Sequence, residues 1–358
     1  MAIDPTAKKL ACALMLTLSL ATGGAHAAPE AGARIRLAVI GDSDSHSYHD
    51  RLRFSGEDGA RGGAHHATTW QWTEALQRLR GDWIDQGEWG HHGAPGAVAR
   101  AAGLVGLQAR APAKEDFRYN FAVSGARCES LMGGERQVPQ LVGLMDEEPE
   151  AWRGGVVVIR IGVNSFGQSD SLERLAADPD DPELSATITR CIAAMREAVQ
   201  HLQQRHPQTQ LVLVGIFDNS NIGDAASAPR APVALRNITA ALDRYDNALR
   251  AMATRDTRIA FFDDRAWFAS LWGGRSPDGQ PRYRDVSIGG RLRVANTQGD
   301  APVNAVLADG HAGSAWNALW ARALVDLIDR HFGARIPAVD EAELLALLQP
   351  GRHRSQGR

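Results

Sequence analysis

Continuous apolar runs that alternate with helical patterns place the strongest constraint on the fold of this chain. Five short runs rich in Val, Ile and Leu are predicted as β-strands: residues 35–40, 117–123, 156–161, 210–216 and 258–262. Several are apolar without interruption, as expected for strands buried on both faces of a parallel sheet. Helical patterns stand among them at 70–79, 185–206, 234–253 and 315–331. This alternation predicts one doubly wound α/β layer structure.

Composition places the chain among globular proteins and argues against two classes of partner. The 358 residues are 44% hydrophobic and 23% charged, with a formal net charge of −3. A balance of this kind does not favour nucleic acid or an anionic membrane surface, and no basic stripe with interleaved aromatic residues occurs in the sequence. We therefore expect no nucleic-acid partner.

The first 27 residues have the features of an export signal. Lys8 and Lys9 supply the positive charge, residues 10–21 are apolar, and Ala25-His26-Ala27 offers small residues for cleavage before Ala28. The apolar stretch is shorter than the roughly 20 residues that a membrane span needs. The sequence therefore predicts a periplasmic or secreted protein with no stable membrane association after cleavage. The alternative is an N-terminal anchor that stays attached.

Cysteine and histidine spacing gives no support for a metal. Removal of the signal leaves Cys128 and Cys191, which either form a disulfide or remain as free buried thiols. No Cys-x-x-Cys pair exists, so a structural zinc site is not expected. The pairs His65-His66 and His91-His92 consist of adjacent residues, which seldom aim at one ion. We expect no metal and no other cofactor.

Two segments break the regular alternation and are predicted as long loops. Residues 51–66 are rich in Gly, Arg and His, and residues 273–301 are rich in Gly, Pro and Asp. Loops of this length often carry binding functions. Near the carboxyl terminus, a short helix is predicted at about 340–348, and the last residues, 351–358, have the composition of an unstructured tail.

A serine follows the first predicted strand directly. The strand 35–40 ends in the turn Gly41-Asp42-Ser43. The carboxyl ends of strands are where α/β folds bind their ligands. A serine hydroxyl becomes a useful nucleophile only when a base takes its proton, so Ser43 is a candidate that needs partners.

Two further fragments offer hydrogen-bond donors after predicted strands. Gly125 follows the run 117–123 and has no side chain, so its backbone N–H is open to a reacting carbonyl oxygen. Asn164 follows the run 156–161, and its amide is a donor suited to a developing oxyanion. The alternatives are a plain strand-ending glycine and an asparagine that caps a turn.

The fourth fragment is Asp309-Gly310-His311, just before the helical pattern at 315–331. His311 is the candidate general base, and Asp309 is the candidate group that orients its ring. The alternative is an Asp-Gly turn followed by a surface histidine.

Together the four fragments resemble the SGNH hydrolase superfamily, also called GDSL esterases and lipases. The resemblance spans residues 34–331, and residues 44–50 resemble those of secreted bacterial members. It implies a three-layer α/β/α, flavodoxin-like sandwich with a five-stranded parallel sheet. It also implies that residues 28–333 form the hydrolase domain, between the signal at 1–27 and a carboxyl-terminal helix and tail at 334–358.

The resemblance also implies a role for each matching residue. Ser43 would be the nucleophile, His311 the general base and Asp309 its partner. The oxyanion hole would consist of the backbone N–H groups of Ser43 and Gly125 and the amide of Asn164. The usual last fragment has two residues between aspartate and histidine, whereas here only Gly310 stands between them. The choice between a Ser–His–Asp triad and a Ser–His dyad therefore stays open.

The predicted activity is hydrolysis of carboxylic esters through an acyl-enzyme. Short acyl chains are expected, with a small-molecule or O-acetylated carbohydrate substrate. The tryptophans that follow the Ser43 segment either pack against sugar rings or belong to the core; they are Trp70, Trp72, Trp83 and Trp89. His46 and His49 either contact substrate or lie in a solvated loop. The alternatives are a lipase or phospholipase of the same fold and a non-catalytic binding protein that retains it.

Overall fold

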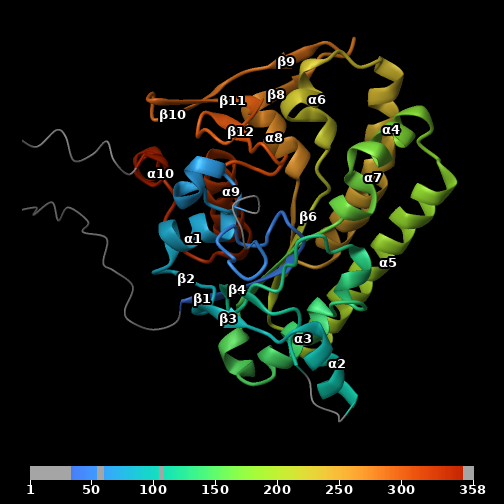
Figure 1. Cartoon of the computed structure of the whole chain (residues 1–358). Coiled ribbons are helices and arrows are strands. Elements are labelled where there is room, and N and C mark those ends of the chain that lie inside the picture. The colour runs from blue at the N-terminus through green and yellow to red at the C-terminus, as the bar shows by residue number, and fades with distance from the viewer. Residues whose placement is uncertain (1–33, 55–59, 105–108, 350–358) are drawn as a thin grey trace, which may run out of the picture. The chain divides into compact units, whose positions relative to one another are not determined.

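A five-stranded parallel sheet forms the centre of the molecule (Figure 1). The computed structural model describes residues 34–54, 60–104 and 109–349. The strands are β1 (Ile35–Gly41), β2 (Ile84–Asp85), β5 (Val156–Arg160), β6 (Gln210–Val214) and β7 (Ile259–Phe262). They lie in the order β2-β1-β5-β6-β7, and every neighbouring pair is parallel. When these five strands are numbered 1 to 5 along the chain, their order in the sheet is 2-1-3-4-5, which is the flavodoxin-like order. The predicted fold class is therefore confirmed.

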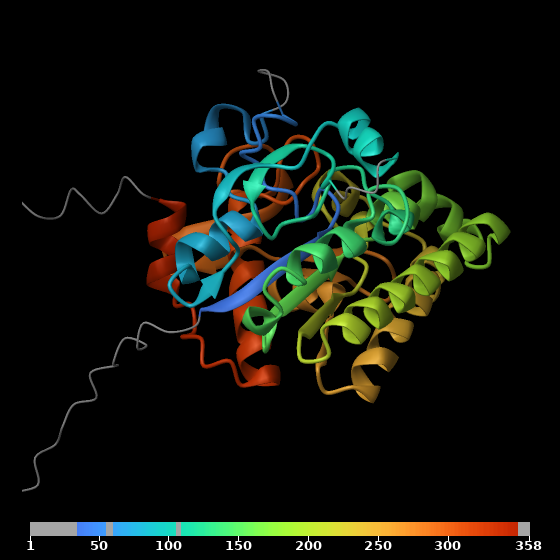
Figure 2. The ribbon, with the colours of Figure 1, turned by 90° about the horizontal axis from the view of Figure 1, so that it is seen from below.

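Helices cover both faces of the sheet, as Figure 2 shows from below. Alternate residues of the strands point to opposite sides. Leu37 and Val39 pack in one apolar cluster with α1 (Trp72–Arg80), α8 (Asp264–Trp272), α9 (Ser314–Phe332) and α10 (Glu341–Leu348). Ala38 and Ile40 pack in the other with α3 (Gln137–Met145), α5 (Pro182–Arg205) and α7 (Pro232–Arg255). The helix predicted near the carboxyl terminus is therefore part of the first cluster.

The remaining elements are short and lie in the connections. The helices are α2 (Gly96–Leu104), α4 (Ser169–Ala177) and α6 (Gly223–Ser227), with helical turns η2 (Gly63–Thr68), η3 (Cys128–Leu131), η4 (Pro149–Trp152), η5 (Val163–Gly167) and η6 (Asn219–Asn221). The predicted export signal, 1–27, and the predicted tail, 351–358, fall outside the described residues.

One predicted strand is wrong. The run 117–123 is not a strand of the central sheet: only its first residue belongs to β4 (Lys114–Phe117), which pairs antiparallel with β3 (Trp89–His92). The fifth place in the sheet belongs to β2, which has two residues. After β4 the chain contacts β1 through an isolated bridge between Val39 and Asn120. The apolar residues of this run reflect burial beside β1, and burial does not require regular pairing.

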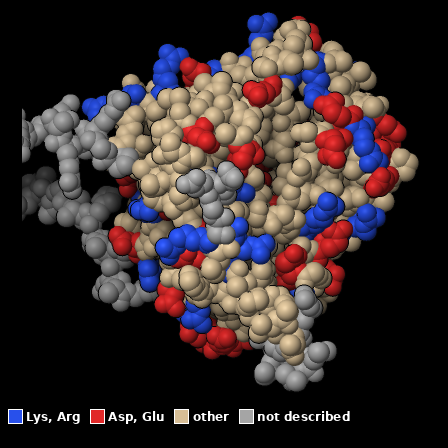
Figure 3. Space-filling view, in the orientation of Figure 1, with Lys and Arg blue, Asp and Glu red and all other residues tan. Residues whose placement is uncertain are grey.

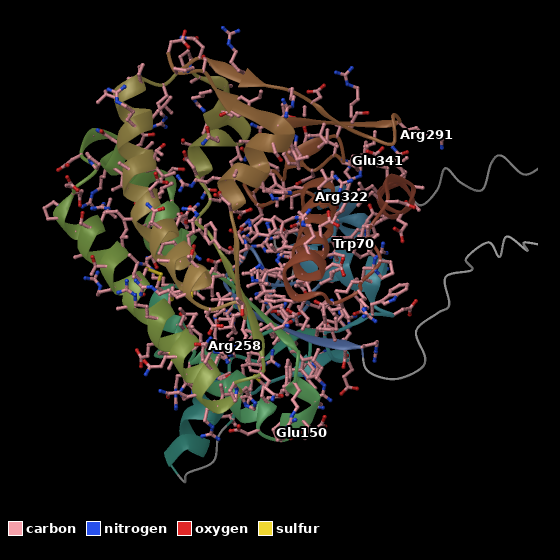
Figure 4. The ribbon with its side chains drawn as sticks, turned by 180° about the vertical axis from the view of Figure 1, so that it is seen from behind. Trp70, Glu150, Arg258, Arg291, Arg322 and Glu341 are labelled. Carbon is pink, nitrogen blue, oxygen red and sulfur yellow. A yellow bond between two sulfur atoms is a disulfide. The ribbon has the colours of Figure 1, made fainter. Side chains whose placement is uncertain are left out.

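The predicted long loop at 273–301 is also wrong. This segment contains a hairpin of β8 (Gly273–Arg275) and β9 (Pro281–Tyr283), followed by β10 (Val286–Ile288) and β11 (Leu292–Gln298), and β12 (Asn304–Val306) follows just after it. Apolar residues at alternate positions of β10 and β11 join the core beside α10. Figure 4 labels Arg291 and Glu341 at this edge, where the N–H of Gly289 donates to Glu341 Oε2 at 2.8 Å. The many Gly, Pro and charged residues of the segment hide this short period-two pattern.

Cys128 and Cys191 form a disulfide that links η3 to α5. Their Cα atoms are 5.1 Å apart, and the bond is drawn in yellow in Figure 4. The two cysteines are separated by 63 positions. In the chain-entropy model, closing a loop of this size stabilises the folded state by about 4 kcal/mol.

Basic and acidic side chains are interspersed over the face seen in Figure 3. Across residues 34–54, 60–104 and 109–349, no helix combines the length and the apolar character that a membrane crossing requires.

Candidate active site

The candidate residues Ser43 and Asn164 lie at the carboxyl ends of neighbouring strands. β1 and β5 pair with Gly41 opposite Arg160. Ser43 follows β1 by two residues, and Asn164 lies in η5, which follows β5. The strand order reverses between these two strands, and α/β folds open a crevice at such a point because the connections leave toward opposite faces.

The turn that carries Ser43 is tightly packed. A Cβ on Gly41 would lie 2.3 Å from the carbonyl oxygen of Arg160, so only glycine fits there. The carbonyl oxygen of Asp42 accepts hydrogen bonds from the N–H groups of Ser45 and His46, both at 3.1 Å. Burial, together with the nearby charge of Asp44, raises the pKa of Asp42 well above its usual range, which favours a protonated carboxyl beside the serine.

The glycine and asparagine fragments contact each other. The N–H of Val123 donates to the carbonyl oxygen of Gly41 at 3.1 Å, which holds the segment leading to Gly125 against the end of β1. Asn164 Nδ2 donates to the carbonyl oxygen of Ala126 at 3.0 Å. Asn164 therefore reaches across to another fragment, which is not the behaviour of a local turn cap. Gly125 is exposed and has φ +83°, a conformation that favours glycine.

Asp309 and His311 meet despite the single residue between them. Asp309 Oδ2 lies 3.0 Å from His311 Nδ1, without the alignment of a good hydrogen bond, and Asp309 Oδ1 accepts from the backbone N–H of His311 at 3.0 Å. Gly310 between them has φ +87°. Partial burial opposes ionisation of Asp309, but His311 and then Arg61 outweigh it and hold the pKa of this carboxyl well below its usual range.

Arg61 is a site residue that sequence reasoning missed. Its Nε donates to Asp309 Oδ2 at 3.1 Å, and its Nη2 lies 3.1 Å from His311 Nε2. A guanidinium can only donate, so Nε2 is the acceptor in this hydrogen bond, and the ring proton of this tautomer is on Nδ1. Among the residues that the structure describes, Ser43 and His311 are not hydrogen-bonded to each other. Arg61 belongs to the predicted loop 51–66, and no spacing rule points to it.

His46 is buried and neither contacts solvent nor lines a substrate surface. Its Nδ1 accepts the backbone N–H of Ser124 at 3.0 Å, and its Nε2 lies 2.7 Å from Asp50 Oδ2. Burial, followed by the charge of Lys114, lowers the pKa of His46 to about 4. The neutral ring therefore holds the segment that carries Gly125 in place through its hydrogen bond to Ser124.

Acidification should destabilise the protein through His46. An unfolded histidine has a pKa of about 6.5 and takes up a proton before the folded one does, so the stability contribution is present above that value. It is lost as the pH falls from about 6.5 to about 4, and the loss is about 3 kcal/mol in free energy of unfolding. Urea unfolding of wild type and His46→Gln at neutral pH and near pH 4.5 measures it. Between the two pH values, the free energy of unfolding should fall further in wild type than in His46→Gln, by most of this amount. Equal falls in the two proteins would contradict the role given to His46.

A groove lies beside the segment that follows Ser43. Its volume is about 710 Å³, and its lining includes His49, His66, Trp70, Trp89 and Phe117. Trp70, labelled in Figure 4, has His49 stacked on it at 4.9 Å and the Arg78 guanidinium 3.6 Å from its ring centre. The other two tryptophans that the sequence groups with them are Trp72 and Trp83. Trp72 is fully buried in the core, and the partly buried Trp83 packs against the core.

The described residues contain no group of three or more His, Cys, Asp or Glu side chains arranged to hold a metal ion. The candidate site brings together a hydroxyl, an imidazole, carboxylates, amide donors and one guanidinium. Such a set is suited to acyl transfer, since it can supply a nucleophile, a base and oxyanion donors.

Comparison with known proteins identifies the class of protein. The sequence profile of the GDSL-like lipase/acylhydrolase family matches residues 79–283, which is more than half of the chain. The chain belongs to this family, and membership supports ester hydrolysis as the general reaction. A search of curated proteins finds no match.

Solved structures of related description resemble the chain only distantly. One is a GDSL-like lipase from Parabacteroides merdae, with 15% identity over 85% of this chain and 97% of that one and a TM-score of 0.40. Another is a carbohydrate esterase family 2 enzyme with a carbohydrate-binding domain from Corynascus thermopiles (Myceliophthora fergusii), with 17% identity over 85% and 69% and a TM-score of 0.39. A third is an extracellular lipase from Streptomyces rimosus, with 17% identity over 80% and 98% and a TM-score of 0.34.

Proposed function

We propose that this chain is an exported serine esterase that cleaves carboxylic esters with short acyl chains, O-acetylated carbohydrates among them. Family membership supports the ester-hydrolase class. The observation that supports the serine mechanism is that hydrogen bonds join remote fragments near the carboxyl ends of the strands. Asn164 contacts the Gly125 segment through Ala126, and the Tyr48 hydroxyl donates to the carbonyl oxygen of Ala312 at 2.8 Å, which joins the Ser43 and His311 segments.

The proposed reaction is acyl transfer in two steps. His311 Nε2 accepts the proton of Ser43 as the hydroxyl attacks the ester carbonyl. The carbonyl oxygen becomes an anion, which the N–H groups of Ser43 and Gly125 and the Asn164 amide stabilise. His311 then protonates the leaving alcohol, and water hydrolyses the acyl-enzyme by the same path. Asp309 keeps the imidazole proton on Nδ1 and stabilises the imidazolium that forms.

The groove beside the site supports a carbohydrate ester more than a lipid. Trp89 is 38% exposed and lies edge-on to Phe117, so an aromatic surface is available for a sugar ring. A lipase would favour a continuous apolar rim. The large exposed apolar side chains of the described residues come instead from separate segments: Leu52, Trp89, Val98, Val233 and Val303.

A chain-length series tests the proposed activity. We expect kcat/KM for p-nitrophenyl esters to be highest at acetate or butyrate and to fall toward palmitate. Release of acetate from an acetylated oligosaccharide then tests the carbohydrate. A maximum at palmitate would favour a lipase, and rates equal to those of Ser43→Ala throughout would favour a non-catalytic binding protein.

Loss of the Asn164 amide should weaken oxyanion stabilisation. We expect Asn164→Ala to lower kcat by about 10²–10³-fold with little change in KM, because the lost hydrogen bond strengthens only as charge develops. Asn237→Ala is a matched control, since Asn237 Nδ2 also donates to a backbone carbonyl, that of Ala176 at 2.9 Å, and makes no hydrogen bond to Asn164. A kcat for Asn164→Ala within threefold of the control would contradict the assignment.

A further inference from the structure

Arg61 is a buried and closely held cation next to the candidate base. Its side chain is 7% exposed. Its guanidinium carbon lies 5.0 Å from the ring centre of Tyr48 and 4.7 Å from that of Phe54. These cation–π contacts restrain the planar guanidinium group. Charged side chains are rarely buried to this extent unless they are paired.

The hydrogen bonds of Arg61 are incomplete. Nε donates to Asp309, and Nη2 donates to His311. Nη1 is buried and finds no partner among the described residues. Asp309 does not neutralise the guanidinium as a dedicated partner, since it also faces His311 Nδ1. A buried charged donor without a partner is costly, so this nitrogen is suited to donate a hydrogen bond to an oxygen of a ligand.

The contact with His311 conflicts with base catalysis. His311 Nε2 has one lone pair, and Arg61 Nη2 occupies it at 3.1 Å. The proposed reaction needs this lone pair for the proton of Ser43. The guanidinium must therefore move away from Nε2, or rotate, before Ser43 can react.

We propose that Arg61 binds a carboxylate carried by the ester substrate, and that this binding frees His311 to act as base. The inference rests on the proposed function and specifies its substrate class as anionic esters. A carboxylate matches the planar fork of a guanidinium, because two parallel N–H donors reach its two oxygens. Its engagement satisfies Nη1, and it releases His311 Nε2 when its second oxygen takes the Nη2 N–H that now points to His311. One event thus completes the hydrogen bonds of Arg61 and releases the base.

Matched pairs of esters test this proposal. The substrates are meta- and para-acetoxybenzoate, each compared with its neutral methyl ester, so that the acyl group stays constant. The measured quantity is the ratio of kcat/KM for the carboxylate to kcat/KM for the methyl ester. Wild type is compared with Arg61→Gln, Arg61→Lys and the control Arg53→Gln. Arg53 is an exposed residue of the same loop, and the structure gives its side chain no contact with His311 or Asp309.

We expect wild type to prefer at least one of the two carboxylates by about tenfold or more, and Arg61→Gln to lose this preference by about tenfold to a hundredfold, as for a lost charge-assisted hydrogen bond. Arg61→Lys should retain part of the preference, and Arg53→Gln should retain all of it. An unchanged ratio in Arg61→Gln, or an equal loss for both esters, would overturn the proposal. Circular dichroism identifies a variant that fails to fold, and Arg61→Lys then carries the comparison.

Binding without turnover provides a second readout. In the Ser43→Ala background, calorimetric titration with meta- and para-acetoxybenzoate should show Kd rising at least about tenfold when Arg61→Gln is added. An unchanged Kd contradicts the proposal. If wild type cleaves the neutral methyl acetoxybenzoates without a preference for the carboxylates, only this inference is contradicted. If wild type is no faster than Ser43→Ala on any ester, the proposed function is contradicted and this inference with it.

Discussion

Replacing Ser43 by alanine is expected to lower kcat for p-nitrophenyl acetate by about 10⁴-fold or more, since the covalent route disappears while the oxyanion donors remain. Ser43 lies in the buried turn after β1, where its residue is 6% exposed. KM should change little, because alanine removes one oxygen and leaves the backbone N–H donor in place. Initial rates under saturating ester, corrected for spontaneous hydrolysis, measure the effect.

Ser45→Ala is the matched control for this substitution. Ser45 lies in the same turn, and its Oγ accepts from Trp72 Nε1 at 3.2 Å, a donor that also reaches the carbonyl oxygen of Asp44. Removal of this hydroxyl therefore leaves no unpaired donor. Mass spectrometry after rapid quenching adds an independent readout: an acyl adduct on wild type and on Ser45→Ala, and none on Ser43→Ala. Retention of more than a hundredth of wild-type kcat by Ser43→Ala would remove the serine mechanism from consideration.

Replacing Asp309 by asparagine is expected to lower kcat by about 10³–10⁴-fold, and the result separates a triad from a dyad. The carboxylate faces the imidazole proton on Nδ1, and asparagine can present an N–H to that nitrogen and so favour the wrong tautomer. The pKa of Asp309 lies well below its usual range, so this group is a carboxylate near neutral pH. A fall in kcat of less than tenfold would support a Ser–His dyad.

Asp300→Asn is the control for this second substitution. Asp300 Oδ1 accepts the N–H of Ala308 at 3.0 Å and supports the same loop without a contact to His311. We expect its kcat to remain within a few-fold of wild type. Asp309→Glu tests geometry at constant charge: partial recovery of kcat relative to Asp309→Asn would show that the negative charge matters as well as its position.

Much of the fold could be predicted because buried parallel strands leave a strong local signal. The apolar runs predict β1, β5, β6 and β7, and each predicted end lies within two residues of the observed one. The missed strand, β2, has two residues, and a pair of residues has no periodicity to detect. The run 117–123 resembles a sheet strand in sequence, because burial beside β1 produces the same composition as strand pairing.

The residues of the candidate site also fall into two groups, those that the sequence predicts and those whose contacts only the structure reveals. Ser43 and Asn164 could be proposed because each follows a recognisable strand, and Asp309 and His311 because they form a short motif. His46 and Arg61 could not be assigned their contacts. Both lie in the segment after the first strand, where the sequence offers polar residues in large numbers and no regular spacing.

Local sequence patterns are enough to predict the parallel layered architecture, the family resemblance and the residues that follow its strands, since strand burial and short motifs are properties of neighbouring residues. Only the tertiary structure decided that His46 lies beneath the Gly125 segment, that the two cysteines are bonded, and that Arg61 occupies the nitrogen of His311 that base catalysis needs. These are contacts between residues far apart in the chain. Their formation depends on how the connections fold back over the sheet, and no local pattern encodes that path.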